Sequence, residues 1–370
     1  MSRNQHRLLC AVFLLLYLSS SIPCHAAAPN VSAAAYVLLD ADSGRVLLAN
    51  NETSELGIAS TTKIMTAVVA LEHSRLTDVV TVKREHLKEG SSMYLAEGET
   101  LTMEELLYGL MLPSGNDAAE CIADYCGGGT ENFVRWMNEK AAALGMTHTS
   151  FANPSGLDAQ GHHSCALDMG RLMAYAMRIP AFAQIVSART VTAGGRTMTN
   201  HNKLLSSLEG CIGGKTGYTG AAGRTLVTCA ERGGLRLIVV TLHDGSDWAD
   251  HAALYEYGFA NYRRESPLRR GGAYALAAVR GGEALCVRLC AEESFFCAVS
   301  EGETLTLRID APETADAPVK AGQALGEAVV LLDGAELARV PLAAETDVKA
   351  VEKTPPSFTE RLRALFGARR

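Results

Sequence analysis

A change in the pattern of apolar residues and turns near Arg264 constrains the fold more than any other feature of the sequence. Before this residue, helix-like stretches lie between strand-like runs; after it, short apolar runs alternate with turns such as Arg280-Gly281-Gly282 and Asp333-Gly334. That spacing predicts a small β-sandwich or barrel. With 370 residues the chain is long enough for two cores. We therefore expect an α/β (α+β) domain over residues 27–263 and an all-β domain over residues 264–346.

The two ends of the chain are expected to lie outside these domains. Residues 1–26 combine basic Arg3 and Arg7 with an apolar run too short for a comfortable membrane span, which predicts a cleaved signal peptide and export. Lipidation at Cys24 is a minor alternative. Residues 347–370 read as a linker and an amphipathic tail, with apolar residues on one helical face and several arginines. Peripheral membrane contact through this tail and packing on the protein itself are equally good interpretations.

Composition excludes some function classes. The net charge is −7 and no long basic block precedes the last few residues, so nucleic-acid binding is not expected. Ten cysteines are present, two of them in the expected signal peptide. None form a C-x-x-C pair, and the histidines are not spaced like zinc ligands, which favours structural cysteines over a metal site. We expect no metal and no cofactor.

Periodicity gives a coarse secondary structure for the first domain. The expected elements are hairpins within 36–48 and 224–242, and helices at about 61–72, 103–112, 116–125, 133–144, 167–177 and 255–262.

The first candidate for chemistry is Ser60-Thr61-Thr62-Lys63. On a helix, positions three apart share a face, so Lys63 can reach the Ser60 hydroxyl. Serine needs a base to become nucleophilic, and a lysine serves only if burial among apolar neighbours lowers its pKa. Taken alone, such a tetrapeptide is more often a capped surface helix.

Two further segments carry polar groups in suitable contexts. Ser114-Gly115-Asn116 follows Pro113 on an expected loop, where a hydroxyl can relay a proton and an amide can hold a carbonyl, although, taken alone, the segment is more often a helix cap. Lys215-Thr216-Gly217 precedes the second hairpin. It offers a cation and a hydroxyl to a carboxylate, and its glycine allows close backbone approach.

Together, in this order, the three segments resemble the penicillin-recognising serine transpeptidase and β-lactamase superfamily. Further stretches, such as Asn153-Pro154-Ser155-Gly156-Leu157, are similar to the low-molecular-mass D-alanyl-D-alanine carboxypeptidases, peptidase family S11. That resemblance covers residues from about 33 to 262, and residues 319–326 and 340–342 are similar to the same family's C-terminal β-domain.

The resemblance implies a penicillin-binding/β-lactamase-like fold, with a central antiparallel sheet flanked by helices and a small all-β domain appended. It implies cleavage of the terminal D-alanine from peptidoglycan stem pentapeptides, with β-lactam antibiotics as covalent inhibitors, at the cell wall, in the periplasmic space or on the outer face of the cytoplasmic membrane. It assigns catalysis to Ser60, Lys63 and Ser114, and substrate binding to Asn116, Lys215, Thr216, Gly217 and Tyr218.

One region departs from the family pattern. Many members carry an arginine after the second hairpin that helps to bind the substrate carboxylate, but residues 242–251 contain none. We expect Lys215 and Thr216 to bind the carboxylate, with Arg224 or His251 as further candidates. A lone histidine such as His251 is more often structural.

Two rival functions stay open at this point. A class A-like β-lactamase shares the three segments but needs a glutamate that activates the deacylating water, and no suitable one lies near residues 155–165. A non-catalytic peptidoglycan-binding scaffold on the same fold is disfavoured by the intact Ser60, Lys63 and Lys215.

Overall fold

The computed structural model describes residues 26–352. The expected signal peptide, apart from Ala26, and most of the expected tail lie outside these residues. The chain divides into two compact units, Met1–Arg264 and Glu265–Arg370. No helix among residues 26–352 is both long and apolar enough to cross a membrane.

An antiparallel five-stranded sheet forms the centre of the first unit, in the order β2-β1-β9-β8-β7. Its strands are β1 (Ala35–Asp40), β2 (Val46–Asn50), β7 (Cys211–Thr219), β8 (Gly223–Arg232) and β9 (Leu235–Leu242). β1 and β9 are almost entirely buried, because helices cover both faces of the sheet.

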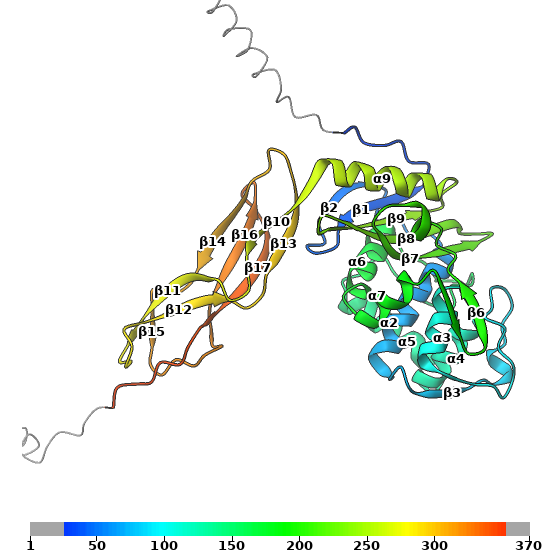
Figure 1. Cartoon of the computed structure of the whole chain (residues 1–370), viewed down its shortest axis with the longest axis horizontal. Helices are drawn as coiled ribbons and strands as arrows, with labels where there is room; N and C mark the ends of the chain where they lie inside the picture. Colours follow the sequence, from blue (N-terminus) through cyan, green and yellow to red (C-terminus); the bar gives the residue numbers. More distant parts are fainter. Residues whose placement is uncertain (1–25, 353–370) are drawn as a thin grey trace, which may run out of the picture. The chain divides into compact units, whose positions relative to one another are not determined.

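Glycines let these helices approach the sheet closely. A Cβ on Gly258 of α9 (Asp247–Asn261) would lie 2.6 Å from Leu237, and Leu38 is also close by. A Cβ on Gly170 of α6 (Ala166–Ala176) would lie 2.4 Å from Leu39. Leu38 and Leu39 are successive strand residues and point to opposite faces, so α9 and α6 cover opposite sides of the sheet (Figure 1).

A helical layer completes this unit around α2 (Lys63–His73), which is buried from Lys63 to Ala70. The burial of eight successive residues, polar Lys63 and Thr66 included, places this part of the helix in the core, and α2 contacts α3, α4, α5, α6 and α7. The other elements are α3 (Met103–Met111), α4 (Asn116–Gly127), α5 (Thr130–Ala143), α7 (Pro180–Ser187), α8 (Leu204–Ser207), the 3-10 turns η1 (Ala59–Thr62) and η2 (Arg84–His86), and the hairpins β3 (Val79–Thr81)–β4 (Thr100–Thr102) and β5 (Thr190–Ala193)–β6 (Arg196–Thr199).

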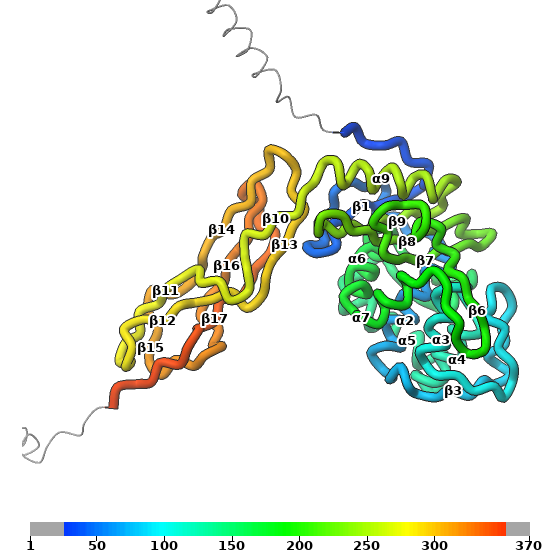
Figure 2. Tube along the Cα trace, in the orientation of Figure 1, coloured from blue at the N-terminus to red at the C-terminus, as the bar shows by residue number. Residues whose placement is uncertain are grey.

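The second unit is all β. Its strands are β10 (Tyr262–Leu268), β11 (Ala273–Arg280), β12 (Cys286–Ala291), β13 (Phe295–Ser300), β14 (Leu305–Asp310), β15 (Thr314–Asp316), β16 (Ala324–Leu332) and β17 (Ala335–Ala344). They form a six-stranded sheet, β14-β16-β17-β12-β11-β15, and a separate β10-β13 pair (Figure 2). Alternating residues such as Val287, Leu289, Val330 and Leu342 fill its core.

The predicted fold class is confirmed, but some element boundaries were wrong. Helix α9 begins at Asp247 rather than near Tyr255. The prediction missed its first turns because buried acidic side chains there break the apolar pattern. The α-helix after Ser60 begins at Lys63, and Ser60 itself lies in η1. Helix α7 and the β5–β6 hairpin were missed.

Candidate active site

Ser60 and Lys63 meet where η1 passes into α2. Ala59, just before Ser60, has a φ of 46°, a left-handed conformation that an alanine adopts only at some cost in energy. Lys63 is fully buried, and its Nζ lies 3.0 Å from Ser60 Oγ. The turn therefore holds the hydroxyl directly against the amine.

Two carbonyl oxygens also contact the Lys63 amine. Its Nζ donates to Asn116 Oδ1 at 2.8 Å and to the Ser155 carbonyl at 2.5 Å. Burial, reinforced by the nearby Lys215 ammonium, holds the pKa of Lys63 well below its usual range. A neutral amine has two N–H groups and one lone pair; because two acceptors engage both N–H groups, the lone pair is left for the Ser60 hydroxyl.

The second segment lies on a tight loop between α3 and α4. Ser114 has a φ of 66°, and the backbone N of Asn116 donates to the Ser91 carbonyl at 2.7 Å. The Asn116 amide also donates to the Glu89 carbonyl at 2.8 Å, which fixes its Oδ1 toward Lys63. Buried Asp117 anchors the neighbouring loop by accepting from the backbone N of Met93 at 3.1 Å.

The third segment lies on β7, the last strand of the sheet. Lys215 is buried, and its Nζ donates to Ser114 Oγ and to the Thr216 carbonyl, each at 2.9 Å. Burial lowers the pKa of Lys215 to about 7. At Gly217 a Cβ would lie 3.0 Å from Ser60 N and 2.4 Å from Thr225 Oγ1. A glycine is required there because β7 runs directly against η1.

A cavity of about 360 Å³ opens over these groups. It is lined by Ser60, Ser91, Ser114, His201, Lys203, Thr216, Gly217, Tyr218, Arg224, Asp247 and Trp248. Lys63, Asn116 and Lys215 are not lining residues but contact three that are, through Ser60 Oγ, the Ser91 carbonyl and Ser114 Oγ respectively. The structure thus brings all eight sequence-predicted residues together around one cavity.

Of the two additional carboxylate candidates, only Arg224 reaches the cavity. Its Nη2 lies 2.7 and 2.9 Å from the carboxylate oxygens of buried Asp247, and its guanidinium lies 5.8 Å from the centre of the Trp248 ring. His251 is buried between Thr228 and Thr241, and burial lowers its pKa to about 3.

Sequence reasoning missed several of the groups just described. Asp247 and Trp248 belong to the part of α9 that was not predicted as a helix. Ser155 contributes a backbone carbonyl, for which residue type gives no signal. Ser91, His201 and Lys203 line the cavity without belonging to a recognised motif.

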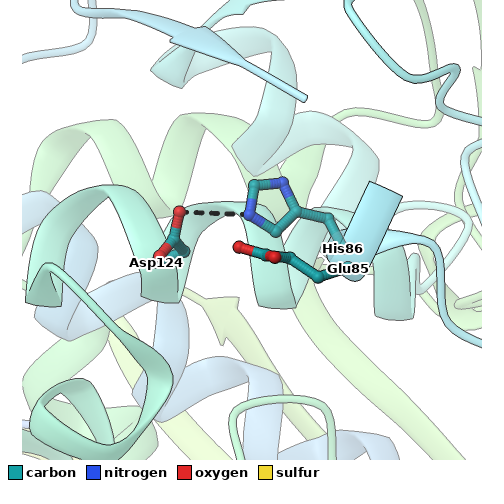
Figure 3. Close-up of side chains that lie close together, drawn as sticks. All are labelled: Glu85, His86 and Asp124. Atoms are coloured by element: carbon teal, nitrogen blue, oxygen red, sulfur yellow. Dashed lines mark hydrogen bonds and ion pairs between the residues drawn. The ribbon is translucent and has the colours of Figure 1, made fainter. Parts of the chain in front are cut away.

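One cluster among residues 26–352 has the composition of a metal site, and it lies outside the cavity. Glu85, His86 and Asp124 lie close together (Figure 3). The backbone N of Lys83 donates to His86 Nδ1 at 3.0 Å, so His86 Nε2 carries the proton facing Asp124 at 3.2 Å. Lys83 Nζ lies 2.5 Å from the same Asp124 oxygen. This ammonium supplies the positive charge that a metal would bring.

The eight cysteines among residues 26–352 are free thiols.

The geometry defines a class of protein: a serine acyl-transfer enzyme with a buried lysine base, a serine-asparagine loop and a lysine-threonine-glycine strand. Comparison with known proteins narrows the class. The D-alanyl-D-alanine carboxypeptidase family matches residues 23–246, and the penicillin-binding protein 5 C-terminal domain matches residues 262–350. The chain belongs to the D-alanyl-D-alanine carboxypeptidase family, and it is an enzyme of that class.

Individual relatives cover most of the chain. D-alanyl-D-alanine carboxypeptidase DacF of Bacillus subtilis is 31% identical over 331 residues, covering 85% of each chain. DacC of Escherichia coli is 33% identical, covering 87% of this chain and 86% of its own. The solved structure of penicillin-binding protein 5 from Haemophilus influenzae aligns with a TM-score of 0.76 at 30% identity, covering 88% of this chain and 99% of its own.

Proposed function

We propose that Ser60 is the nucleophile that the substrate acylates, with Lys63 as its base. The observation that carries the proposal is the position of Lys63 Nζ, 3.0 Å from Ser60 Oγ with two other acceptors engaging its N–H groups. Ser60 Oγ attacks the carbonyl of the penultimate D-alanine of a stem pentapeptide while Lys63 takes the hydroxyl proton. The backbone N–H groups of Ser60 and Tyr218 receive the developing oxyanion, and losing one such donor typically costs about a hundredfold in turnover.

The leaving group departs on the side of Ser114. When the C–N bond breaks, Ser114 gives its proton to the amine of the departing D-alanine and recovers one from Lys215, 2.9 Å away. A pKa of about 7 suits Lys215 to this exchange near neutral pH. Asn116 aligns the substrate amide. Water then attacks the Ser60 ester and gives a proton to Lys215 through Ser114, while Lys63 returns its proton to Ser60 Oγ as the ester C–O bond breaks. The product leaves as a carboxylic acid that ionises in solvent, and both lysines are back in their starting states.

The terminal carboxylate of the substrate binds at the other wall of the cavity. Thr216 and Lys215 supply a hydroxyl and a cation, and Gly217 allows close approach. Arg224 adds a second cation from β8, where it lies in register with Tyr218. Within residues 26–352, Asp247 accepts from Nη2 of the Arg224 guanidinium. Nε and Nη1 of the same guanidinium are left to donate to a substrate carboxylate.

Location and organisation complete the proposal. Residues 1–26 direct export as a signal peptide, residues 27–263 form the catalytic domain and residues 264–346 the β-sandwich domain. Residues 347–370 are the linker and the tail that makes peripheral contact with the outer face of the cytoplasmic membrane. The substrate is the peptidoglycan stem peptide, and β-lactams acylate Ser60.

Release of D-alanine from a synthetic stem pentapeptide tests this proposal. Wild type should release D-alanine and be labelled by a fluorescent penicillin, and Ser60→Ala should do neither. A wild-type protein that neither releases D-alanine nor is labelled would favour the scaffold alternative, and rapid turnover of the penicillin would favour a β-lactamase. Persistent labelling of Ser60→Ala would refute the assignment of the nucleophile.

A further inference from the structure

The loop that carries Ser155 is pressed onto the start of α2. Asn153 Oδ1 accepts from the backbone N of Ser155 at 3.2 Å and of Gly156 at 2.7 Å, which closes a tight turn. Thr66 Oγ1 donates to the Pro154 carbonyl at 2.6 Å. A Cβ on Gly156 would lie 2.0 Å from the Ala59 carbonyl. The position of the Ser155 carbonyl therefore depends on how this loop is held against η1 and α2.

His162 connects Ala152, the first residue of the loop formed by residues 152–157, with Thr62, the residue before Lys63. The backbone N of Ala152 donates to His162 Nδ1 at 3.0 Å. Because Nδ1 accepts, the proton of the neutral ring is on Nε2, which donates to Thr62 Oγ1 at 2.8 Å. The ring also packs edge-on against Phe151, 5.9 Å between centroids.

The charge state of His162 suits this bridge. Burial, with a smaller contribution from His163, lowers the pKa of His162 to about 4. The ring is therefore neutral at neutral pH, with one acceptor and one donor nitrogen, as the two hydrogen bonds require. His162 is not among the residues that line the cavity.

We propose that His162 is a positioning residue that clamps the 152–157 loop to Thr62, keeps the Ser155 carbonyl on Lys63 and so directs the Lys63 lone pair at Ser60. The inference rests on the proposed function, in which Lys63 is the base. It extends that function to a residue outside the three recognised segments.

The bridge should matter for the chemical step rather than for substrate binding. Without it the loop can move away, and one N–H of Lys63 loses its acceptor, so the lone pair is no longer directed at the hydroxyl. A displacement of about 1 Å in a catalytic arrangement can cost up to about a hundredfold in rate. The carboxylate end of the cavity, formed by Thr216 and Arg224, is not involved.

The test measures acylation of Ser60 by a chromogenic β-lactam, separating the maximal acylation rate from the apparent dissociation constant. We expect His162→Ala to lower the maximal rate about tenfold or more with little change in the dissociation constant. His162→Gln should restore it to within about threefold, because an amide can accept from Ala152 and donate to Thr62. The matched control is His163→Ala, whose ring lies 3.5 Å from Glu55 instead; it should acylate like wild type.

Thermal unfolding of each variant separates positioning from loss of fold. If His162→Ala is unfolded, Thr62→Val breaks the same bridge from its other end and should slow acylation in a folded protein. The inference is overturned if folded His162→Ala or Thr62→Val acylates as fast as wild type, if His163→Ala is slowed equally, or if folded His162→Gln is no faster than His162→Ala. A wild-type protein that is not acylated would instead refute the proposed function.

Discussion

Replacing Arg224 by glutamine should separate recognition of the terminal carboxylate from acyl transfer. The Arg224 side chain is 45% exposed, so its interaction with a substrate carboxylate is partly screened. A hydrogen bond to a charged group contributes about 1.5–3 kcal/mol, and the lower end applies here. We therefore expect kcat/KM for a diacyl-lysyl-D-alanyl-D-alanine peptide to fall about tenfold, since about 1.4 kcal/mol corresponds to a factor of ten.

The assay compares this peptide with its C-terminal amide, which carries no carboxylate. The loss should appear with the free acid and be nearly absent with the amide. Arg232→Gln is a matched control, because Arg232 is also on β8 but pairs with Glu256 at 2.7 Å and is not among the cavity residues. Equal losses on the acid and the amide, or an equal effect of Arg232→Gln, would refute the assignment of Arg224 to the carboxylate.

The remaining predictions concern the strand and the buried lysine. Gly217→Ala should abolish D-alanine release and penicillin labelling in a folded protein, because the added Cβ would lie 2.4 Å from Thr225 Oγ1 and 3.0 Å from Ser60 N; normal labelling would contradict the close approach of β7 to η1. Lys215 has a folded-state pKa of about 7 against 10.5 when unfolded, so the unfolded chain binds the extra proton between these values and the free energy of unfolding should rise with pH across that window. Chemical denaturation at pH 7 and pH 9 should show this rise in wild type and a smaller one in Lys215→Met. An equal rise in the free energy of unfolding of the two proteins would argue against a depressed pKa of Lys215. Replacing Asp247 by asparagine should produce a smaller loss on the free acid than Arg224→Gln, measured as kcat/KM, because the arginine keeps its charge but loses its anchor; no loss would show that the pair does not position Arg224.

Residue type and spacing predicted the groups that the cavity brings together, and periodicity predicted most of the helices around it. Ser60, Asn116 and Lys215 could be recognised because each carries a side chain whose chemistry is visible in the sequence. The fold class followed from the same segments together with the short apolar runs and turns that alternate after Arg264.

The missed features share a physical cause. Asp247 and Asp250 are buried at the start of α9 because they bind Arg224 and Ser32, and buried charges hide a helix from an apolar pattern. The Ser155 carbonyl is a backbone group, which any residue could supply. His162 acts through hydrogen bonds to Ala152 and Thr62 that only the folded loop creates.

The central claim is that Lys63 is uncharged before it accepts the Ser60 proton, and the pH dependence of Ser60 acylation tests it most directly. Acylation by a β-lactam should reach its plateau well below 10.5, the usual pKa of a lysine, with an apparent value that belongs to the buried Lys63 and Lys215 as a pair. Lys63→Ala should fall to a small residual rate at every pH. A wild-type rate that keeps climbing tenfold per pH unit up to pH 10 would mean that Lys63 is charged at neutral pH, and would contradict the account.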